Sequence, residues 1–249
     1  MTQANRQTFL DLDFDRLTIG EAARTIVAKA DKRDPFAYVV TPNVDSLVRL
    51  ELCPDLRALY RNAWLTISDS HILQLLARAT GIDLPAAPGA DLIETLLRTS
   101  VRARDPVTVI GGSAATIQAL RSRFGLADIR WYDPPAGLRD DPAARTRCVD
   151  FIIANPAPFV FLAVDSPHQE MIAAECLARG TAIGVALCCG ASLDFLAGDP
   201  LSAPHWMRAA NLAGLYRLLA NPLRLWRRYL IAGPHILRIW MKWRAAPQA

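Results

Sequence analysis

Small polar, acidic and glycine residues follow five short apolar runs, and these are residue types that bind or activate a charged ligand. The segments are Thr41 to Asp45, Ser68 to Ser70, Gly111 to Ser113, Asp165 to Glu170 and Gly190 to Asp194. Side chains and helix N-termini gathered at one edge would form a pocket rich in hydrogen-bond donors, which suits a diphosphate. The candidate substrate-binding residues are Thr41, Asn43, Gly111, Gly112, Gln169, Glu170 and Asp194.

The same segments also have a purely structural interpretation. Asn43, Ser70, Ser113 and Ser166 are favourable helix N-caps, and the stretch from Ser166 has the spacing of a capping box with Pro167 as the first helical residue. Each of these residues taken singly fits a cap. However, polar residues follow all five apolar runs, and this convergence favours a binding site.

Six β-rich runs alternate with helical patterns. The runs are Phe36 to Thr41, Trp64 to Ser68, Val107 to Ile110, Ile129 to Tyr132, Phe159 to Val164 and Ala182 to Leu187. The helical patterns are Ile19 to Ala30, Val44 to Asn62 with a break at Pro54, Ala90 to Val101, Ala114 to Phe124, Ala143 to Ala154 and His168 to Arg179. This alternation predicts an α/β fold with a mostly parallel sheet covered on both faces. Ligands of such sheets bind at the carboxyl ends of the strands.

Several cofactor and metal motifs are missing. Gly111 and Gly112 lack the third glycine of a dinucleotide fingerprint. The chain has no P-loop, HExxH or GxSxG motif, and its four histidines lack the spacing of metal ligands. We therefore expect no cofactor and no metal.

Composition restricts the class of protein. The chain has 249 residues, of which 52% are hydrophobic and 21% are charged, and this balance excludes a disordered protein. The acidic residues near the start argue against a signal peptide, and no apolar run is long enough to span a bilayer. Five cysteines make neither an even disulfide set nor a CxxC motif, so we expect a reducing, cytoplasmic location.

Charge is distributed unevenly along the chain. Residues 200–249 hold eight Lys and Arg residues, no Asp or Glu and four of the six tryptophans, whereas residues 1–199 carry a net charge of −4. An acid-free segment rich in Arg and Trp is typical of a surface that meets anionic lipid. The acidic remainder argues against a nucleic-acid partner.

An ordered series of motifs resembles the bacterial WecG/TagA/CpsF glycosyltransferases, family 26. The matching segments are Thr41 to Asp45, Ile67 to Ser70, Gly89 to Leu92, Pro167 to Glu170, Gly190 to Gly198, Ala203 to Met207, Leu215 to Leu219 and Asn221 to Tyr229. The resemblance implies a Rossmann-like core and an inverting enzyme. Its substrates would be a UDP-sugar donor and a polyprenyl-diphosphate-linked acceptor at the inner face of the cell membrane, and its products surface or exopolysaccharides.

The resemblance also implies roles for single residues. Asp69 would be the general base, and Thr41, Asn43 and Gln169 would line the pocket of the donor. Asp194 would contact the nucleotide or stabilise a turn. Arg217, Arg224 and Arg227 would complete the site by stabilising the UDP leaving group, because none of the five segments named above holds an Asp-x-Asp motif that would bind a metal. An alternative is that these arginines meet only lipid headgroups.

The predicted organisation is a catalytic domain over residues 1–199 and a basic, amphipathic helical appendage over residues 200–249, with a helix beginning at Asn221 and Pro222. Leu223, Trp226, Leu230, Leu237, Trp240 and Met241 of the appendage would bury apolar area at the membrane. Association into a homo-oligomer is a further possibility that the family suggests.

Departures from the family pattern keep other functions open. Ala86 stands where members carry a basic residue, Ala213 and Gly214 replace Glu-Trp, Ser70 replaces a glycine and His168 replaces a lysine. These changes point to a different donor or to weakened catalysis. The alternatives are a non-catalytic, membrane-associated subunit of a polysaccharide assembly complex and an NAD(P)-linked oxidoreductase.

Overall fold

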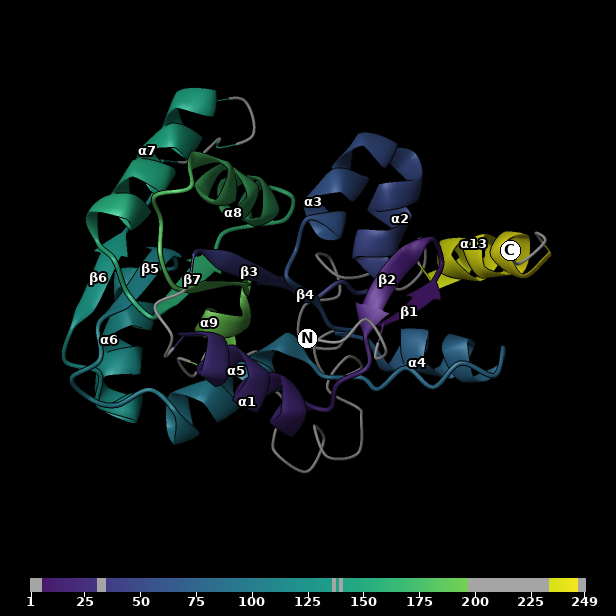
Figure 1. Ribbon diagram of the computed structural model, residues 1–249, viewed down its shortest axis with the longest axis horizontal. Helices are drawn as coiled ribbons and strands as arrows, with labels where there is room; N and C mark the ends of the chain where they lie inside the picture. The colour runs from purple at the N-terminus through teal and green to yellow at the C-terminus, as the bar shows by residue number, and fades with distance from the viewer. Residues whose placement is uncertain (1–5, 31–34, 136–137, 139–140, 197–232, 246–249) are drawn as a thin grey trace.

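A six-stranded sheet forms the centre of the molecule. The computed structural model describes residues 6–30, 35–135, 138, 141–196 and 233–245. The strands are β3 (Ala37–Val40), β4 (Leu65–Thr66), β5 (Val107–Gly111), β6 (Ile129–Tyr132), β7 (Phe159–Ala163) and β8 (Val185–Cys188). They lie in the order β4-β3-β8-β7-β5-β6, and every pairing of neighbours is parallel (Figure 1). All six predicted strands and the predicted α/β class are confirmed.

Helices cover both faces of the sheet because successive strand residues point to opposite sides. Val160 and Leu162 contact one apolar cluster, and Phe159 and Phe161 contact the other. The first cluster lies under α2 (Val44–Leu52), α3 (Arg57–Arg61), α7 (Pro142–Ala154) and α8 (His168–Arg179). The second lies under α1 (Ile19–Ala30), α5 (Gly89–Thr99), α6 (Ala114–Phe124) and α9 (Ser192–Leu196). The predicted break at Pro54 is a short 3₁₀ turn, Pro54–Leu56.

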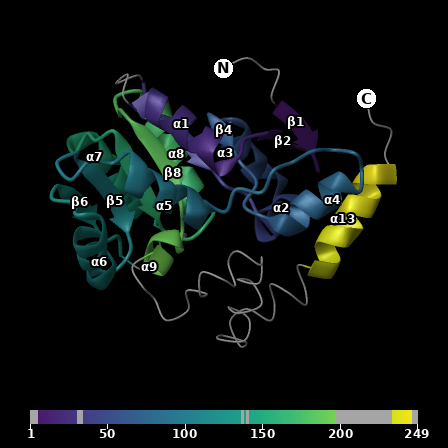
Figure 2. The same ribbon diagram turned by 90° about the horizontal axis from the view of Figure 1, so that it is seen from below.

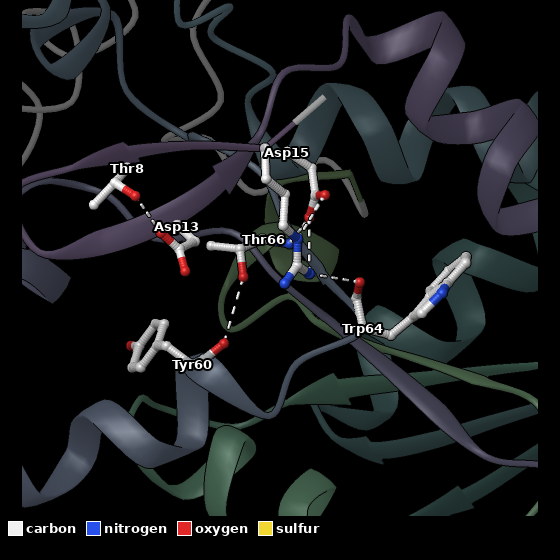
Figure 3. A network of polar contacts seen from close by, with 7 residues as sticks. Thr8, Asp13, Asp15, Tyr60, Trp64 and Thr66 are labelled. Atoms are coloured by element: carbon white, nitrogen blue, oxygen red, sulfur yellow. Dashed lines mark hydrogen bonds and ion pairs between the residues drawn. The ribbon is translucent and has the colours of Figure 1, made fainter. Parts of the chain in front are cut away.

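An antiparallel hairpin that the sequence pattern did not predict protects the β4 edge of the sheet. It consists of β1 (Arg6–Phe9) and β2 (Leu12–Asp15). The carboxylate of Asp15 accepts a 2.9 Å hydrogen bond from the backbone N–H of Thr66, and Arg6 Nη2 donates to the carbonyl of Trp64. Figure 3 shows Asp15 beside Thr66 and Trp64. These contacts satisfy backbone groups that an edge strand otherwise exposes, so β4 leads into Asp69 from a fixed position.

The C-terminal helix α13 (Gly233–Ala245) packs on the body of the molecule. Its Ile236 is buried in the same cluster as α2, Trp243 stacks edge-on against Phe9 with ring centroids 5.4 Å apart, and Trp240 Nε1 donates to the carbonyl of Leu76. Leu76 belongs to α4 (His71–Arg78), a helix absent from the predicted elements. Trp240 is therefore half-buried against the protein rather than wholly directed to a membrane, while the helix predicted from Asn221 lies outside the described residues.

Strand order and helix placement favour a ligand site at the carboxyl ends of β3 and β8. These strands are neighbours, yet β3 is followed by α2 on one face and β8 is followed by α9 on the other. The chain therefore leaves the carboxyl ends of β3 and β8 toward opposite faces of the sheet, and ligands of doubly wound sheets bind where neighbouring strand ends diverge in this way. We call this candidate ligand position the crevice. The segments beginning at Thr41 and at Cys189 line this position.

Candidate functional site

Asp69 is held at the carboxyl edge of the sheet, in the short segment between β4 and α4. Its backbone N–H donates to the carbonyl of Pro42 at 3.0 Å, and its Oδ1 accepts a 2.9 Å hydrogen bond from the backbone N–H of Gly89. The first contact joins the segment after β4 to the segment after β3. The second orients the carboxylate on the N-terminal turn of α5, where the helix dipole favours a negative charge. Asp69 remains half-buried.

Gly89 is the point at which three other segments meet. A Cβ placed on Gly89 would lie 3.1 Å from Thr41 Oγ1 and 3.7 Å from Ser192 Oγ. The lack of a side chain at Gly89 therefore allows Thr41, Asp69 and Ser192 to gather from the ends of β3, β4 and β8. Gly89 and Ser192 belong to segments that resemble the family motifs, but neither is among the site residues predicted from the sequence.

Asn43, Ser70 and Ser113 cap helices. Asn43 Oδ1 accepts from the backbone N–H of Ser46, Ser70 Oγ accepts from that of Leu73, and Ser113 Oγ accepts from that of Thr116. The structural interpretation of these three residues is confirmed. Asn43 begins α2 directly after Thr41, so its cap also places the residue at the crevice between β3 and β8.

Ser166 was wrongly predicted to be a cap. Helix α8 begins at His168, Pro167 occupies the N-cap position, and no side chain caps the helix. The Ser166 hydroxyl instead accepts a 2.6 Å hydrogen bond from Arg49 Nη1 on α2. The Ser166-Pro167 pair resembles a capping sequence, but the Ser166 hydroxyl accepts its hydrogen bond from Arg49 on another helix.

Gln169 and Glu170 are buried in the first turn of α8, with exposed fractions of 7% and 3%. Gln169 Oε1 accepts from the backbone N–H of Gly190 at 2.8 Å, and Gln169 Nε2 donates to Glu170 Oε1 at 3.0 Å. Gln169 therefore links the segment after β7 to the segment after β8. Loss of water around the Glu170 carboxyl raises its pKa above the usual value of 4.5.

Gly111, Gly112 and Asp194 lie on the β5 side of the crevice. Gly111 has a φ of 83°, and a Cβ there would lie 2.6 Å from the carbonyl oxygen of Ala163, so only glycine allows β5 and β7 to end side by side. Asp194 Oδ1 accepts a 2.6 Å hydrogen bond from Thr116 Oγ1, which also joins the cap of α6. Asp194 thus ties α9 to the turn that follows Gly112.

Comparison with known proteins identifies the family. A family model described as "Glycosyl transferase WecG/TagA/CpsF family" matches residues 7–249, which is essentially the whole chain. The chain belongs to the WecG/TagA/CpsF glycosyltransferase family. Membership makes the protein a transferase that uses a sugar donor and an acceptor.

The candidate site has two parts. One part consists of Thr41, Asp69, Gly89 and Ser192, where a carboxylate stands beside hydroxyl groups and a helix N-terminus. The other part consists of Gln169 and Gly190, joined to the first through the short turn before Ser192. Asp194 and the Gly111-Gly112 turn extend the edge toward β5.

Two further findings concern metal ions and membranes. Among residues 6–30, 35–135, 138, 141–196 and 233–245, no three His, Cys, Asp or Glu side chains form a group that could hold a metal ion. Within the same part of the chain, no helix has both the length and the hydropathy needed to cross a membrane. All five cysteines fall in the described part, and all are free thiols. The predicted catalytic residues Arg217, Arg224 and Arg227 lie outside it.

Proposed function

We propose that this family member is an inverting glycosyltransferase that moves a sugar from a UDP-sugar to a polyprenyl-diphosphate-linked acceptor during the assembly of a surface or exopolysaccharide. The observation that carries the proposal is the Asp69 carboxylate, held by the Gly89 N–H beside Thr41 at the mouth of the crevice. A carboxylate so placed has the chemistry of a general base, which accelerates such reactions by roughly 10² to 10⁴-fold.

In the proposed step, Asp69 takes the proton of an acceptor hydroxyl. The hydroxyl oxygen attacks the anomeric carbon from the face opposite the leaving group and forms the new glycosidic bond. The bond from the anomeric carbon to the diphosphate oxygen breaks, and UDP departs with the electron pair. A single displacement inverts the configuration at the anomeric carbon.

The donor would lie across the crevice between β3 and β8. Thr41 and Asn43 approach from the β3 side, and Gln169, the Gly111-Gly112 turn and Asp194 approach from the other strands. Arg217, Arg224 and Arg227 are proposed to offset the charge that develops on the diphosphate, since guanidinium groups pair well with phosphate oxygens. Transfer should then continue in EDTA, and restoration of lost activity by Mg²⁺ or Mn²⁺ would refute this part of the proposal.

A screen of donors tests the function. Purified chain is mixed with UDP-sugars, or with the matching ADP-, GDP- and dTDP-sugars, and with a short-chain polyprenyl-diphosphate-sugar. Mass spectrometry detects the product, and NMR gives its anomeric configuration. We expect transfer from a UDP-sugar with inversion. Retention of configuration, or transfer only from another nucleotide, would contradict the proposal.

We also propose that the protein binds the inner face of the cell membrane through one surface, defined by Ile72, Leu75 and Arg78 of α4 and by Leu237, Arg238 and Met241 of α13. The two helices meet at the hydrogen bond from Trp240 to the carbonyl of Leu76, and Figure 2 shows them next to each other. Leu75 is 64% exposed and Met241 is 58% exposed. Exposed apolar side chains flanked by arginines favour an anionic lipid surface.

A further inference from the structure

A chain of buried polar contacts extends from α2 to the turn after β8. Arg49 donates to Ser166, Ser166 lies 3.4 Å from the Tyr60 hydroxyl, and Tyr60 donates to Glu170 Oε1 at 3.3 Å. Gln169 donates to the same Glu170 oxygen and accepts from the Gly190 N–H. Glu170 is therefore the residue at which the contacts from α2 and α3 meet the contacts of the crevice.

Glu170 does not face solvent. Its exposed fraction is 3%, and its Oε2 is buried without a hydrogen-bond partner among the described residues. Burying a charged carboxylate without a paired cation costs free energy. A buried carboxyl group therefore takes up a proton when the cost of desolvation exceeds the stabilisation from neighbouring cations. Desolvation raises the pKa of Glu170 more than the Arg49 charge lowers it. A protonated carboxyl would keep Oε1 as an acceptor for two donors.

The acceptor at Glu170 Oε1 determines which way the Gln169 amide faces. A side-chain amide has one accepting and one donating end, and the two ends have nearly the same shape. With Nε2 donating to Glu170, Oε1 points at the Gly190 N–H. The reversed amide would bring an NH₂ group against that N–H and lose the 2.8 Å hydrogen bond.

We propose that Glu170 is a positioning residue, which fixes the Gln169 amide and thereby holds the Gly190–Ser192 turn against Thr41 and Gly89. The proposal rests on the function proposed above, because it assigns the turn to the donor pocket. Apolar side chains could fill the space of Glu170, but none would supply the acceptor. A displacement of about 1 Å in such a turn is enough to slow transfer by up to about 10²-fold.

Paired variants test the proposal. Glu170→Gln keeps an acceptor of the same size, whereas Glu170→Met fills the space without one. We expect the Gln variant to transfer sugar within about threefold of the wild-type rate, and the Met variant to transfer it about tenfold to 100-fold more slowly. Hydrogen exchange at the Gly190 amide, followed by NMR, should be about tenfold faster in the Met variant only, since the amide then loses one of its two acceptors.

The two readouts separate failure of this proposal from failure of the function. Unchanged exchange at Gly190 in folded Glu170→Met, or faster exchange with an unchanged transfer rate, would overturn the positioning role. If Glu170→Met does not fold, Glu170→Asp retains an acid that is one carbon too short to reach Gln169, and we expect the same losses from it. Wild-type protein that transfers no sugar from any donor would count against the proposed function, whereas the exchange result would still decide whether Glu170 holds the turn.

Discussion

The carboxyl edge of the sheet and the surface formed by α4 and α13 use side chains in opposite ways. At the edge, polar groups from five segments hold one another: Gly89 binds Asp69, Gly190 binds Gln169 and Thr116 binds Asp194. On the α4 and α13 surface, large apolar side chains are exposed and their neighbours are cations. The first arrangement fixes geometry, and the second leaves apolar area available for a partner.

This difference suggests a division of labour between chemistry and location. Side chains that catalyse must stand within a fraction of an ångström of the reacting atoms, and cross-linked polar groups meet that requirement. A lipid surface is fluid and needs only apolar area and charge. Substitutions on one region should therefore leave the task of the other intact. Three experiments examine that separation, and a fourth examines the carboxyl edge alone.

The largest effect is expected from Asp69→Asn. The amide still accepts from Gly89 but cannot take a proton, so we expect kcat for transfer to fall by roughly 10² or more while KM for the donor changes little. Flotation with anionic liposomes should stay at the wild-type level. Asp128→Asn, an exposed acid before β6 at the opposite edge of the sheet, serves as the matched control. Equal kcat in Asp69→Asn would remove Asp69 from the mechanism.

A loss of membrane binding is expected from Leu237→Glu combined with Met241→Glu. The double variant removes two exposed apolar side chains of α13 and places two negative charges beside an anionic surface. Each juxtamembrane charge contributes about 1 kcal/mol, so liposome binding should weaken by at least roughly tenfold. Transfer to a water-soluble acceptor should persist.

Leu177→Glu supplies the control for this experiment. Leu177 is also exposed but belongs to α8, which lies away from α4 and α13 in Figures 1 and 2. If Leu177→Glu weakened liposome binding as much as the double variant, the surface on α4 and α13 would not be the membrane contact.

Several strands were predictable because they are continuous apolar runs, and the strand ends then located Asp69 and Gln169. The hairpin was not predictable by the same means. Its strands have four residues each, and its turn places Leu10 and Asp11 at φ values of 52° and 59° without the glycine or asparagine that usually marks such a turn.

Contacts between distant segments account for the rest of what the sequence pattern did not show. Ser166 has the local signature of a cap, yet Arg49 on α2 takes its hydroxyl. The sequence predicts Glu170 as a substrate-binding residue, yet in the structure its carboxyl group accepts hydrogen bonds from Tyr60 and Gln169. Local spacing predicts which residues follow a strand, but the partner of each side chain depends on which helices the strand order brings together.

A smaller effect, confined to the carboxyl edge, is expected from Gly89→Ala. The added Cβ would stand 3.1 Å from Thr41 Oγ1, so either Thr41 or the Gly89 N–H must shift by a few tenths of an ångström. We expect kcat to fall several-fold, on the order of 1 kcal/mol in transition-state stabilisation, with liposome binding unchanged. Gly20→Ala in α1 is the control, because its Cβ would approach nothing closer than 3.5 Å. Wild-type kcat in Gly89→Ala would show that the contact tolerates motion.

The smallest effect is a pH dependence of stability that comes from Glu170. Burial raises its pKa in the folded protein above the usual 4.5, so between these two pH values the folded state binds more protons than the unfolded state. The stabilising contribution is therefore complete below about pH 4.5 and declines as the pH rises through the raised pKa. Glu170→Gln cannot titrate, so the Tm of wild type minus that of the variant should fall as the pH rises from 4.5 to 8.

The ionisable groups that face Glu170 should not contribute to the pH dependence of this Tm difference. Tyr38 on β3, Tyr60 on α3 and Cys188 on β8 all have a pKa that burial raises further, so they stay neutral over this range. The cation nearest to them is Arg49 on α2, which donates to Ser166. Groups elsewhere titrate alike in both proteins and cancel in the difference. A Tm difference that is constant or grows with pH would show that Glu170 is charged in the folded protein. The oxygen that accepts from Gln169 would then belong to a carboxylate stabilised by the Arg49 charge and not to a neutral acid.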